Sequence, residues 1–241
     1  MRPDGHWTII TGAAGGIGLA VTRMAISEGR RVLALDCDIA ALRDLATDSL
    51  VAQSIDVADE AALKSAIDAA AAQAPVVALV CCAAIFPAAP VEEITVASWD
   101  AVFRVNVEGS LFACQAVLPH MRRAGNGSIV LFSSTMARTG GIGAAHYASS
   151  KGAILGLARS MALDVAKEGI RVNTVSPGLT DTAQPRGNMS AALMFERAAR
   201  TPMGRIGEAD EMADAVFFLL SDDASFMTGQ DLRINGGSGL F

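Results

Sequence analysis

The chain has 241 residues, 51% of them apolar and 18% charged, with a formal net charge of −6 and three lysines. This balance argues against a nucleic-acid-binding surface, which needs clustered positive charge, while the apolar fraction is ample for one large α/β domain. The N-terminal residues include no apolar segment of the kind found in secretion signals. The four cysteines (37, 81, 82 and 114) lack partners at zinc-ligand spacing and are interpreted as free thiols of a cytoplasmic protein without a metal site.

The first predicted strand, Trp7–Thr11, leads into a glycine-rich turn, Gly12–Gly18, and then into a helical pattern. Glycines between a strand and a helix let the backbone approach a pyrophosphate, and the helix N-terminus supplies free N–H groups and a partial positive charge. The spacing is G-x-x-x-G-x-G rather than the G-x-G-x-x-G of the commonest dinucleotide folds. The turn therefore indicates a nucleotide site only in combination with other features.

The second predicted strand, Arg31–Asp36, ends in a carboxylate 20 residues after Gly16. An acid at this position accepts hydrogen bonds from the adenosine ribose hydroxyls of a dinucleotide and repels the 2′-phosphate of NADP. Gly15 and Cys37 offer no positive charge to such a phosphate, so the sequence favours NAD. The alternative is that Asp36 only opens the turn before the next helix, which is a frequent use of Asp.

Strands and helices alternate along the rest of the chain. Strands are predicted at Val51–Ile55, Val76–Cys82, Gly127–Ser134, Gly169–Val175 and Gln230–Asn235, and helices at Asp38–Ala46, Glu60–Ala72, Ser98–Arg123, Ala144–Lys167 and Glu208–Leu220. The uncharged stretch Ala74–Val91 approaches the length of a membrane span, but three prolines interrupt it, and it is interpreted as a buried strand entering a loop. The alternation predicts one α/β domain over residues 1–241, a doubly wound parallel sheet with helices on both faces and a lid at about residues 179–205.

Tyr147, the sole tyrosine, lies four residues before Lys151 in a predicted helix, so both side chains project from one face. A free phenol has a pKa of roughly 10, and a nearby ammonium favours the phenolate and lowers that value toward neutrality. A Tyr/Lys pair at this spacing can therefore donate or remove a hydroxyl proton. The alternative is a surface tyrosine and lysine that share a helix face by chance.

Together these motifs resemble those of the short-chain dehydrogenase/reductase family over nearly the whole chain. The resemblance rests on the order and spacing of Thr11-Gly-x-x-x-Gly16-Ile-Gly18, Asp36, Asp56-Val57, Asn106, Ser134, Tyr147-x-x-x-Lys151 and Pro177-Gly178. It implies a Rossmann-type parallel sheet of seven strands that binds NAD(P) at the carboxyl ends of its strands, and commonly a homotetramer.

The resemblance also implies roles for individual residues. Tyr147 would exchange a proton with the substrate oxygen, Ser134 would hydrogen-bond that oxygen, and Lys151 would hold the nicotinamide ribose and lower the Tyr147 pKa. Asn106 would keep a water that connects Lys151 to solvent. The implied cofactor contacts are Gly12, Gly15, Gly16, Ile17 and Gly18 at the phosphates, Asp36 at the adenosine ribose, Asp56 and Val57 at the adenine, Cys82 and Ala83 near the adenosine, Tyr147 and Lys151, and Pro177, Gly178, Thr180 and Thr182 at the carboxamide.

One segment departs from the family pattern. Where the family usually has Asn-Asn-Ala-Gly after the fourth strand, this chain has Cys81-Cys82-Ala83-Ala84. Thiols are weak substitutes for Asn side chains, so stability or cofactor affinity is expected to differ while the backbone contacts are retained. A nucleophilic thiol is disfavoured because no neighbour in the sequence would lower its pKa.

The loops at the strand ends are expected to select the substrate. Residues 179–205 carry Arg186, Arg197, Arg200 and Arg205, which could bind an anionic substrate or be ordinary surface charges. His146, beside Tyr147, is interpreted as a loop or interface histidine rather than a second base. The helix Ala153–Val165 is apolar on most of its circumference and is expected to pack against a second copy of the chain.

Three functions remain open. The favoured one is an NAD-dependent oxidoreductase that transfers a hydride between nicotinamide and a secondary alcohol or ketone, such as a sugar, polyol or hydroxy acid, with Tyr147 as general acid/base. A 3-oxoacyl-thioester (acyl-carrier-protein) reductase would share these residues, but it normally uses NADPH and so fits Asp36 poorly. A non-enzymatic nucleotide-binding redox sensor or scaffold is expected to lack Tyr147 or Lys151. The expected partners are a small-molecule substrate and further copies of the chain, with no nucleic acid or membrane.

Overall fold

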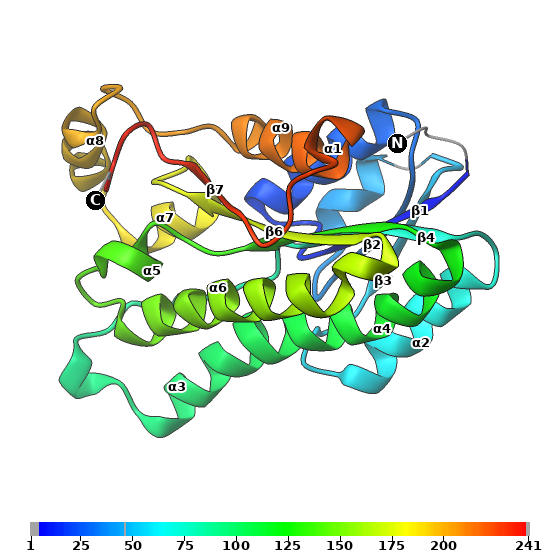
Figure 1. Ribbon diagram of the computed structural model, residues 1–241. Coiled ribbons are helices and arrows are strands. Elements are labelled where there is room, and N and C mark those ends of the chain that lie inside the picture. Colours follow the sequence, from blue (N-terminus) through cyan, green and yellow to red (C-terminus); the bar gives the residue numbers. More distant parts are fainter. Residues whose placement is uncertain (1–4, 46, 240–241) are drawn as a thin grey trace.

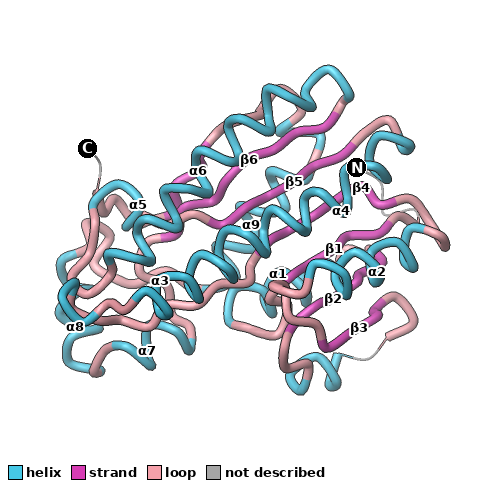
Figure 2. The backbone as a smooth tube through the Cα atoms, turned by 90° about the horizontal axis from the view of Figure 1, so that it is seen from below, coloured by secondary structure: helices cyan, strands magenta, loops and turns pink. Residues whose placement is uncertain are grey.

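The computed structural model describes residues 5–45 and 47–239, and within them the chain forms a parallel sheet of seven strands (Figure 2). The strands lie side by side in the order β3-β2-β1-β4-β5-β6-β7. Their bounds are β1 Trp7–Thr11, β2 Arg31–Asp36, β3 Leu50–Ser54, β4 Val76–Cys81, β5 Gly127–Phe132, β6 Ile170–Pro177 and β7 Asp231–Ile234. The predicted doubly wound parallel sheet is confirmed.

Helices cover both faces of the sheet (Figure 1). α1 (Gly16–Ser27) and α9 (Ala209–Leu220) pack together on one face, and α2 (Glu60–Ala71), α4 (Gly109–Ala124) and α6 (Ala145–Val165) lie on the other. The remaining helices are α3 (Val96–Phe103), α5 (Met136–Thr139), α7 (Ala183–Asn188) and α8 (Ala191–Arg200), with short 3-10 helices at Ala40–Leu45, Val91–Glu93, Ala166–Glu168 and Asp222–Ala224. α5, α7 and α8 gather at one end of the sheet.

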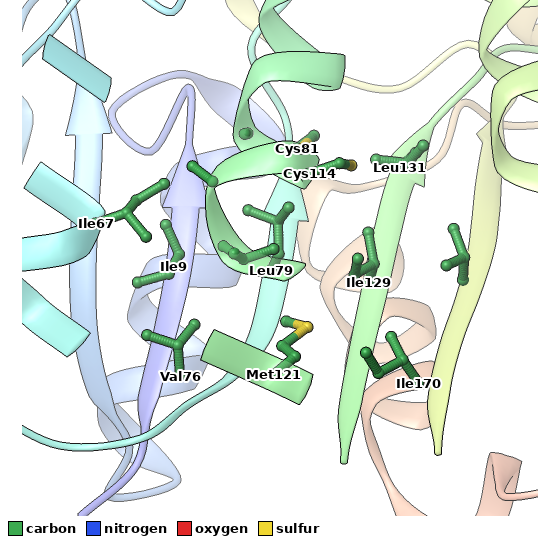
Figure 3. Packing of buried hydrophobic residues seen from close by; sticks show 14 of the residues in the cluster. Ile9, Ile67, Val76, Leu79, Cys81, Cys114, Met121, Ile129, Leu131 and Ile170 are labelled. Carbon is green, nitrogen blue, oxygen red and sulfur yellow. The ribbon is translucent and has the colours of Figure 1, made fainter. Parts of the chain in front are cut away.

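The core consists of one apolar layer on each face of the sheet. Neighbouring strand residues alternate between the layers, so that Ile9 packs with Ile67 of α2 and Met121 of α4, while Ile10 packs on the α1 and α9 side. Figure 3 shows the first of these layers. Every residue of β1, β4 and β5 is buried, as expected for central parallel strands that are covered on both faces.

Side chains at the helix ends account for several element boundaries. Asp59 caps α2 and Ser190 caps α8, each by accepting a backbone N–H bond from the first turn. α9 begins with a capping box between Glu208 and Glu211. α4 ends at Gly125, whose φ of 71° is the left-handed conformation that stops a helix.

α3 and α4 form one continuous helical stretch, Val96–Ala124, with a π-helical turn at Arg104–Glu108 between them. The sequence predicted this helix, Ser98–Arg123, without the interruption. By length and composition alone the stretch could cross a membrane, but its residues Val117 and Met121 are fully buried in the core. The helix is therefore a structural part of this fold.

Most predicted boundaries lie within two residues of the observed ones, and the larger differences concern short elements. The predicted helix Asp38–Ala46 is instead a 3-10 helix at Ala40–Leu45, and residue 46 lies outside the described residues. α5 and α7 were not expected, because their four and six residues are too few to show a helical period. The stretch Ala74–Val91 contains β4 and the loop after it, as predicted.

The strand order places a switch point between β1 and β4, where the direction of the successive crossovers reverses. Parallel sheets of this kind bind ligands outside the carboxyl ends of the strands at such a point. The glycine-rich turn leaves the sheet there after β1, and the segments after β4, β5 and β6 leave it at the same edge. These segments carry most of the predicted site residues.

Candidate active site

A cavity of about 580 Å³ opens at the carboxyl ends of β4, β5 and β6, a size typical of small-molecule sites. Its walls come from the segments after these strands, from α6, and from the segment 179–205 that includes α7 and α8. The predicted site residues that line it are Ile17, Cys82, Ser134, Tyr147, Lys151, Pro177, Gly178, Thr180 and Thr182.

Tyr147 and Ser134 meet in this cavity. Their hydroxyl groups share a hydrogen bond, and Phe86 stacks on the Tyr147 ring with 4.5 Å between the ring centroids. The backbone N–H of Met136 donates to Ser134 Oγ at 3.1 Å and so holds that hydroxyl in place. Burial raises the pKa of Tyr147 to about 12, and the hydrogen bond with Ser134 offsets part of the rise. The phenol therefore carries its proton at neutral pH.

Lys151 is close to the Tyr147 ring, but its ammonium group is bonded to the backbone. Nζ lies 5.7 Å from the ring centroid and donates to the carbonyl oxygen of Phe132 at 2.8 Å. Burial lowers the pKa of Lys151 to about 8. In the chain alone the pKa of Tyr147 is raised, with burial as the largest cause, and the lowering by Lys151 that the resemblance implies stays a prediction.

Asn106 lies fully buried in the π-helical turn and connects two segments of the site. Its Oδ1 accepts from the Ile85 N–H at 2.8 Å, and its Nδ2 donates to the Ile85 carbonyl at 3.1 Å and to Ser150 Oγ at 3.0 Å. The amide therefore holds the loop after β4 against the part of α6 that carries Lys151. The water-holding role implied by the resemblance stays a prediction.

The glycine-rich turn packs closely against two other site segments. Gly12 has a φ of +64°, and a Cβ atom there would lie 2.4 Å from the backbone nitrogen of Ala83. A Cβ atom on Gly16 would lie 2.5 Å from Cβ of Thr182, and Gly18 is buried behind the turn. The turn thus brings Ala83 and Thr182 together at the start of α1.

The structure shows the turn-opening role of Asp36, and its contact with the adenosine ribose stays a prediction. Its Oδ2 accepts from the N–H of Ala14, inside the glycine-rich turn, at 2.9 Å, and its Oδ1 accepts from the N–H of Asp38 at 3.2 Å. The carboxylate therefore opens the turn after β2 and is also fixed beside the glycine-rich turn. Among the described residues no Lys or Arg side chain forms an ion pair with it.

The remaining predicted cofactor residues follow β3 and β6. Asp56 accepts a backbone N–H bond within its own turn, and Val57 is buried. Pro177 ends β6, and the buried Thr180 donates to the Gly178 carbonyl at 3.2 Å. Asp56 and Val57 lie outside the cavity, whereas the other three line it.

The two cysteines after β4 face different surroundings. Cys81 is buried in the core, where its thiol shares a hydrogen bond with Cys114 (Figure 3), whereas Cys82 lines the cavity. All four cysteines are free thiols. Burial raises the pKa of Cys82 well above its usual range, so this thiol is not activated as a nucleophile.

Two side chains beside Tyr147 were not assigned to the site from the sequence. Phe86 belongs to the loop 85–91, where an aromatic residue among small ones and prolines was the available signal. His146 was expected in a loop or an interface, but it lies in the first turn of α6 and is fully buried. Neither of its ring nitrogens has a hydrogen-bond partner among the described residues.

Known proteins are similar to this chain over most of their length. A family model described as enoyl-(acyl carrier protein) reductase matches residues 12–239. The cis-4-hydroxycyclohexanecarboxylate dehydrogenase of Sinomonas cyclohexanicum is 38% identical over 95% of this chain and 94% of its own length. The 3-oxoacyl-[acyl-carrier-protein] reductase of Thermotoga maritima is 34% identical over 98% of this chain and 99% of its own.

A solved structure has a closely similar fold. A Brucella melitensis structure described as a short-chain dehydrogenase/reductase, glucose/ribitol dehydrogenase, superimposes with a TM-score of 0.91 at 29% identity, and 98% of each chain is covered. The relatives named here are dehydrogenases and reductases that match across nearly their whole length. The chain therefore belongs to the short-chain dehydrogenase/reductase family and is an oxidoreductase that acts on CH–OH groups.

Proposed function

We propose that the protein interconverts a secondary alcohol and a ketone with NAD as its cofactor and Tyr147 as the general acid/base. The observation that carries this proposal is the meeting of Tyr147, Ser134 and Lys151 in one cavity beside the glycine-rich turn. Proton transfer, hydrogen bonding to the substrate oxygen and a buried positive charge are what carbonyl reduction or alcohol oxidation requires.

The cavity and its surroundings fit a nicotinamide dinucleotide. Gly15 is the N-cap residue of α1. A Cβ atom added to Gly15 would have no neighbour closer than 3.8 Å, so there is room for phosphates at the helix N-terminus. Asp36 is held beside this turn for the ribose hydroxyls. Bound there, the nicotinamide would accept or donate the hydride, while the protein orients it. The residues proposed to hold it are those of the predicted set, from Gly12 to Thr182.

Each side chain of the site has a separate role in the proposed proton transfer. The protonated phenol of Tyr147 donates to the carbonyl oxygen during reduction, and Ser134 donates a hydrogen bond to the same oxygen as negative charge develops on it. In oxidation the phenolate is the base, so loss of the phenol proton precedes removal of the alcohol proton. Lys151 supplies positive charge in the wall of the cavity, and Asn106 joins the Ile85 backbone to the Ser150 hydroxyl of α6.

The alternative is an NADPH-dependent 3-oxoacyl-thioester reductase. The relative from Thermotoga maritima favours it, whereas Asp36 without a paired cation disfavours the 2′-phosphate. A non-enzymatic sensor is the least supported function, because the chain retains the full set of proton-transfer residues.

The deciding experiment is paired titration of the protein with NADH and NADPH, followed by nicotinamide fluorescence. We expect tighter binding of NADH, and Asp36→Ala to weaken NADH binding and reduce the discrimination against NADPH. Turnover of secondary alcohols with NAD completes the test. Tighter binding of NADPH, with reduction of a 3-oxoacyl thioester, would move the proposal to the alternative.

Three properties of the whole protein belong to the same proposal. Residues 179–205, with α7 and α8, act as the substrate lid. The chain assembles as a homotetramer, which is supported by an outward face of α6 that carries small residues and Leu163 at 84% exposure. It works in the cytoplasm, in agreement with its free cysteines.

A further inference from the structure

The four arginines of the segment 179–205 differ in what their guanidinium groups contact. Arg186 pairs bidentately with Asp181, with both distances 2.7 Å, and Arg205 pairs bidentately with Glu211 at 2.6 and 2.8 Å. Arg200 lies 3.7 Å from Glu196. Their positive charges are thus balanced by carboxylates of the chain itself.

Arg197 has no such partner. Among the described residues no carboxylate lies within ion-pair distance of its guanidinium, and no hydrogen bond reaches it. The side chain is only partly exposed, and it lines the same cavity as Tyr147. Basic residues near the C-terminus of a helix can favour the helix dipole, but that effect does not require a side chain turned to a cavity.

The cavity that Arg197 lines contains no counter-charge. Its described lining residues include Arg197, Arg200 and Lys151 but no Asp or Glu. The wall is otherwise made of small, polar and apolar residues, with Phe86 and Met189 among the larger ones. Positive charge on the wall of a site that has no acid among its described lining residues attracts anions, and an unpaired guanidinium there presents the fork of donors that matches a carboxylate.

We propose that the substrate is a hydroxy acid, whose carbinol lies at Tyr147 and whose carboxylate is bound by Arg197. This inference rests on the proposed function, because it names the substrate class of the same site. The carbon frame between the two polar groups lies in the apolar part of the cavity. Arg197 is then a specificity-determining residue, and Arg200 at the exposed rim remains bonded to Glu196.

The test compares each of several cyclic and straight-chain secondary hydroxy acids with its neutral primary amide. We expect wild-type kcat/KM to be about 100-fold higher for the acid that fits best than for its amide, a typical effect of losing a charge-assisted pair. Arg197→Gln should remove that preference and leave kcat/KM for the amide within a few fold. Arg197→Lys should retain part of the preference, because it keeps the charge but not the bidentate geometry.

Two controls separate this role from others. Arg186→Gln, whose guanidinium pairs with Asp181 and is not among the described residues that line the cavity, should leave the preference for the acid within a few fold of wild type. The Kd of NADH should be unchanged in Arg197→Gln, whereas a weakened Kd would assign the guanidinium to the cofactor and overturn the proposal. Equal turnover of acid and amide by the wild type would overturn it as well, while leaving the proposed dehydrogenase activity intact.

A binding measurement decides the case in which no alcohol is turned over. Calorimetric titration of the wild type and Arg197→Gln with a saturated carboxylate that has no hydroxyl, such as cyclohexanecarboxylate, and with its amide needs no reaction. Binding of the carboxylate that depends on Arg197 would support the anion site even though the proposed function had failed. Absence of such binding in the wild type, with NADH present, would overturn the inference itself.

Discussion

At the scale of single residues, the proton of Tyr147 is held more firmly than on a free tyrosine. The half-buried Tyr147 ring stacks on Phe86, and desolvation raises the pKa of its phenol to about 12 even though Ser134 hydrogen-bonds it. In the proposed mechanism the phenol is therefore protonated, as reduction of a carbonyl at neutral pH requires, whereas alcohol oxidation needs the proton removed first. Alkaline pH is accordingly expected to favour oxidation over reduction.

The phenol can be tested directly with Tyr147→Phe, which keeps the ring and its stacking on Phe86. Turnover should fall by roughly 10²–10⁴, the usual contribution of a general acid/base. The Kd of NADH and the melting temperature should stay close to wild type, which would show that the site is intact. A turnover within twofold of wild type would remove Tyr147 from the mechanism.

The buried Lys151 is expected to make the free energy of unfolding depend on pH. Its pKa is lowered from 10.5 to about 8 in the folded chain, so between these pH values the unfolded chain binds more protons and stability rises with pH. Below pH 8 the buried charge costs roughly 3 kcal/mol. Lys151→Met should therefore be more stable than wild type at pH 7, and this advantage should shrink as the pH rises from 8 to 10.5.

Chemical denaturation of wild type and variant at pH 7 and at pH 10 measures this difference. The exposed Lys167 provides the control, since Lys167→Met should change stability little and equally at both pH values. A stability difference between Lys151→Met and wild type that is the same at both pH values would contradict the buried-charge account.

At the scale of elements, the start of α1 and the segment 179–205 are in direct contact. Gly16→Ala would place a Cβ atom 2.5 Å from the side chain of Thr182, so one of the two segments must move. Forced contacts of this kind typically cost 1–3 kcal/mol. Gly15→Ala is the matched control, because its Cβ atom would lie 3.8 Å from the nearest other atom.

Thermal unfolding of the two glycine variants without cofactor tests this packing. Gly16→Ala should lower the melting temperature, while Gly15→Ala should leave it close to wild type. Equal effects of the two substitutions would show that close packing between Gly16 and Thr182 does not contribute to stability.

The first turn of α6 contains His146, a buried residue whose imidazole forms no hydrogen bond with the described residues. An unsatisfied buried polar group costs about 1–3 kcal/mol, so His146→Leu should raise the free energy of unfolding by about 1 kcal/mol or more. His120→Leu is the contrasting variant, since His120 Nε2 is bonded to Asp68 at 2.6 Å and its loss should lower stability. Denaturant unfolding that shows His146→Leu to be the less stable of the two would contradict this account.

The sequence predicted the long strands and helices well, because they have a clear hydrophobic period. It predicted short helices, the π-helical turn and contacts between distant residues poorly. Strong alternation and apolar runs located the strands and the Tyr147 helix to within two residues, because burial on a sheet determines those patterns. The π-helical turn at Arg104–Glu108 left no periodic signal, since a single extra residue in a turn hardly changes the pattern.

Within the site, residue identity and spacing predicted that side chains from different segments, such as Tyr147 and Ser134, lie close together. They could not predict that Lys151 donates to the Phe132 carbonyl, because a backbone acceptor carries no side-chain signature. The unpaired state of Arg197 was equally out of reach, since it depends on which carboxylates its neighbours already bind.

At the scale of the whole molecule, the outward face of α6 bears on assembly. The helix buries its large apolar residues on the sheet side, and Leu163 remains as a large exposed one. We expect light scattering at micromolar concentration to give a mass that is a multiple of 24.8 kDa. Leu163→Glu should reduce that mass, whereas Phe195→Glu, on the exposed side of α8, should not. A monomer mass for the wild type would end the proposal of a homo-oligomer.

The single tyrosine of the chain gives the enzyme an optical label of its own. Because Tyr147 is the one phenol in 241 residues, the ultraviolet change that accompanies phenol ionisation arises from the cavity alone. The protonation state of Tyr147, the proposed general acid, can therefore be recorded in the unmodified protein, with and without NADH or a carboxylate ligand. Isotopic labelling of tyrosine would likewise yield one magnetic resonance signal, already assigned, at the point where the reaction takes place.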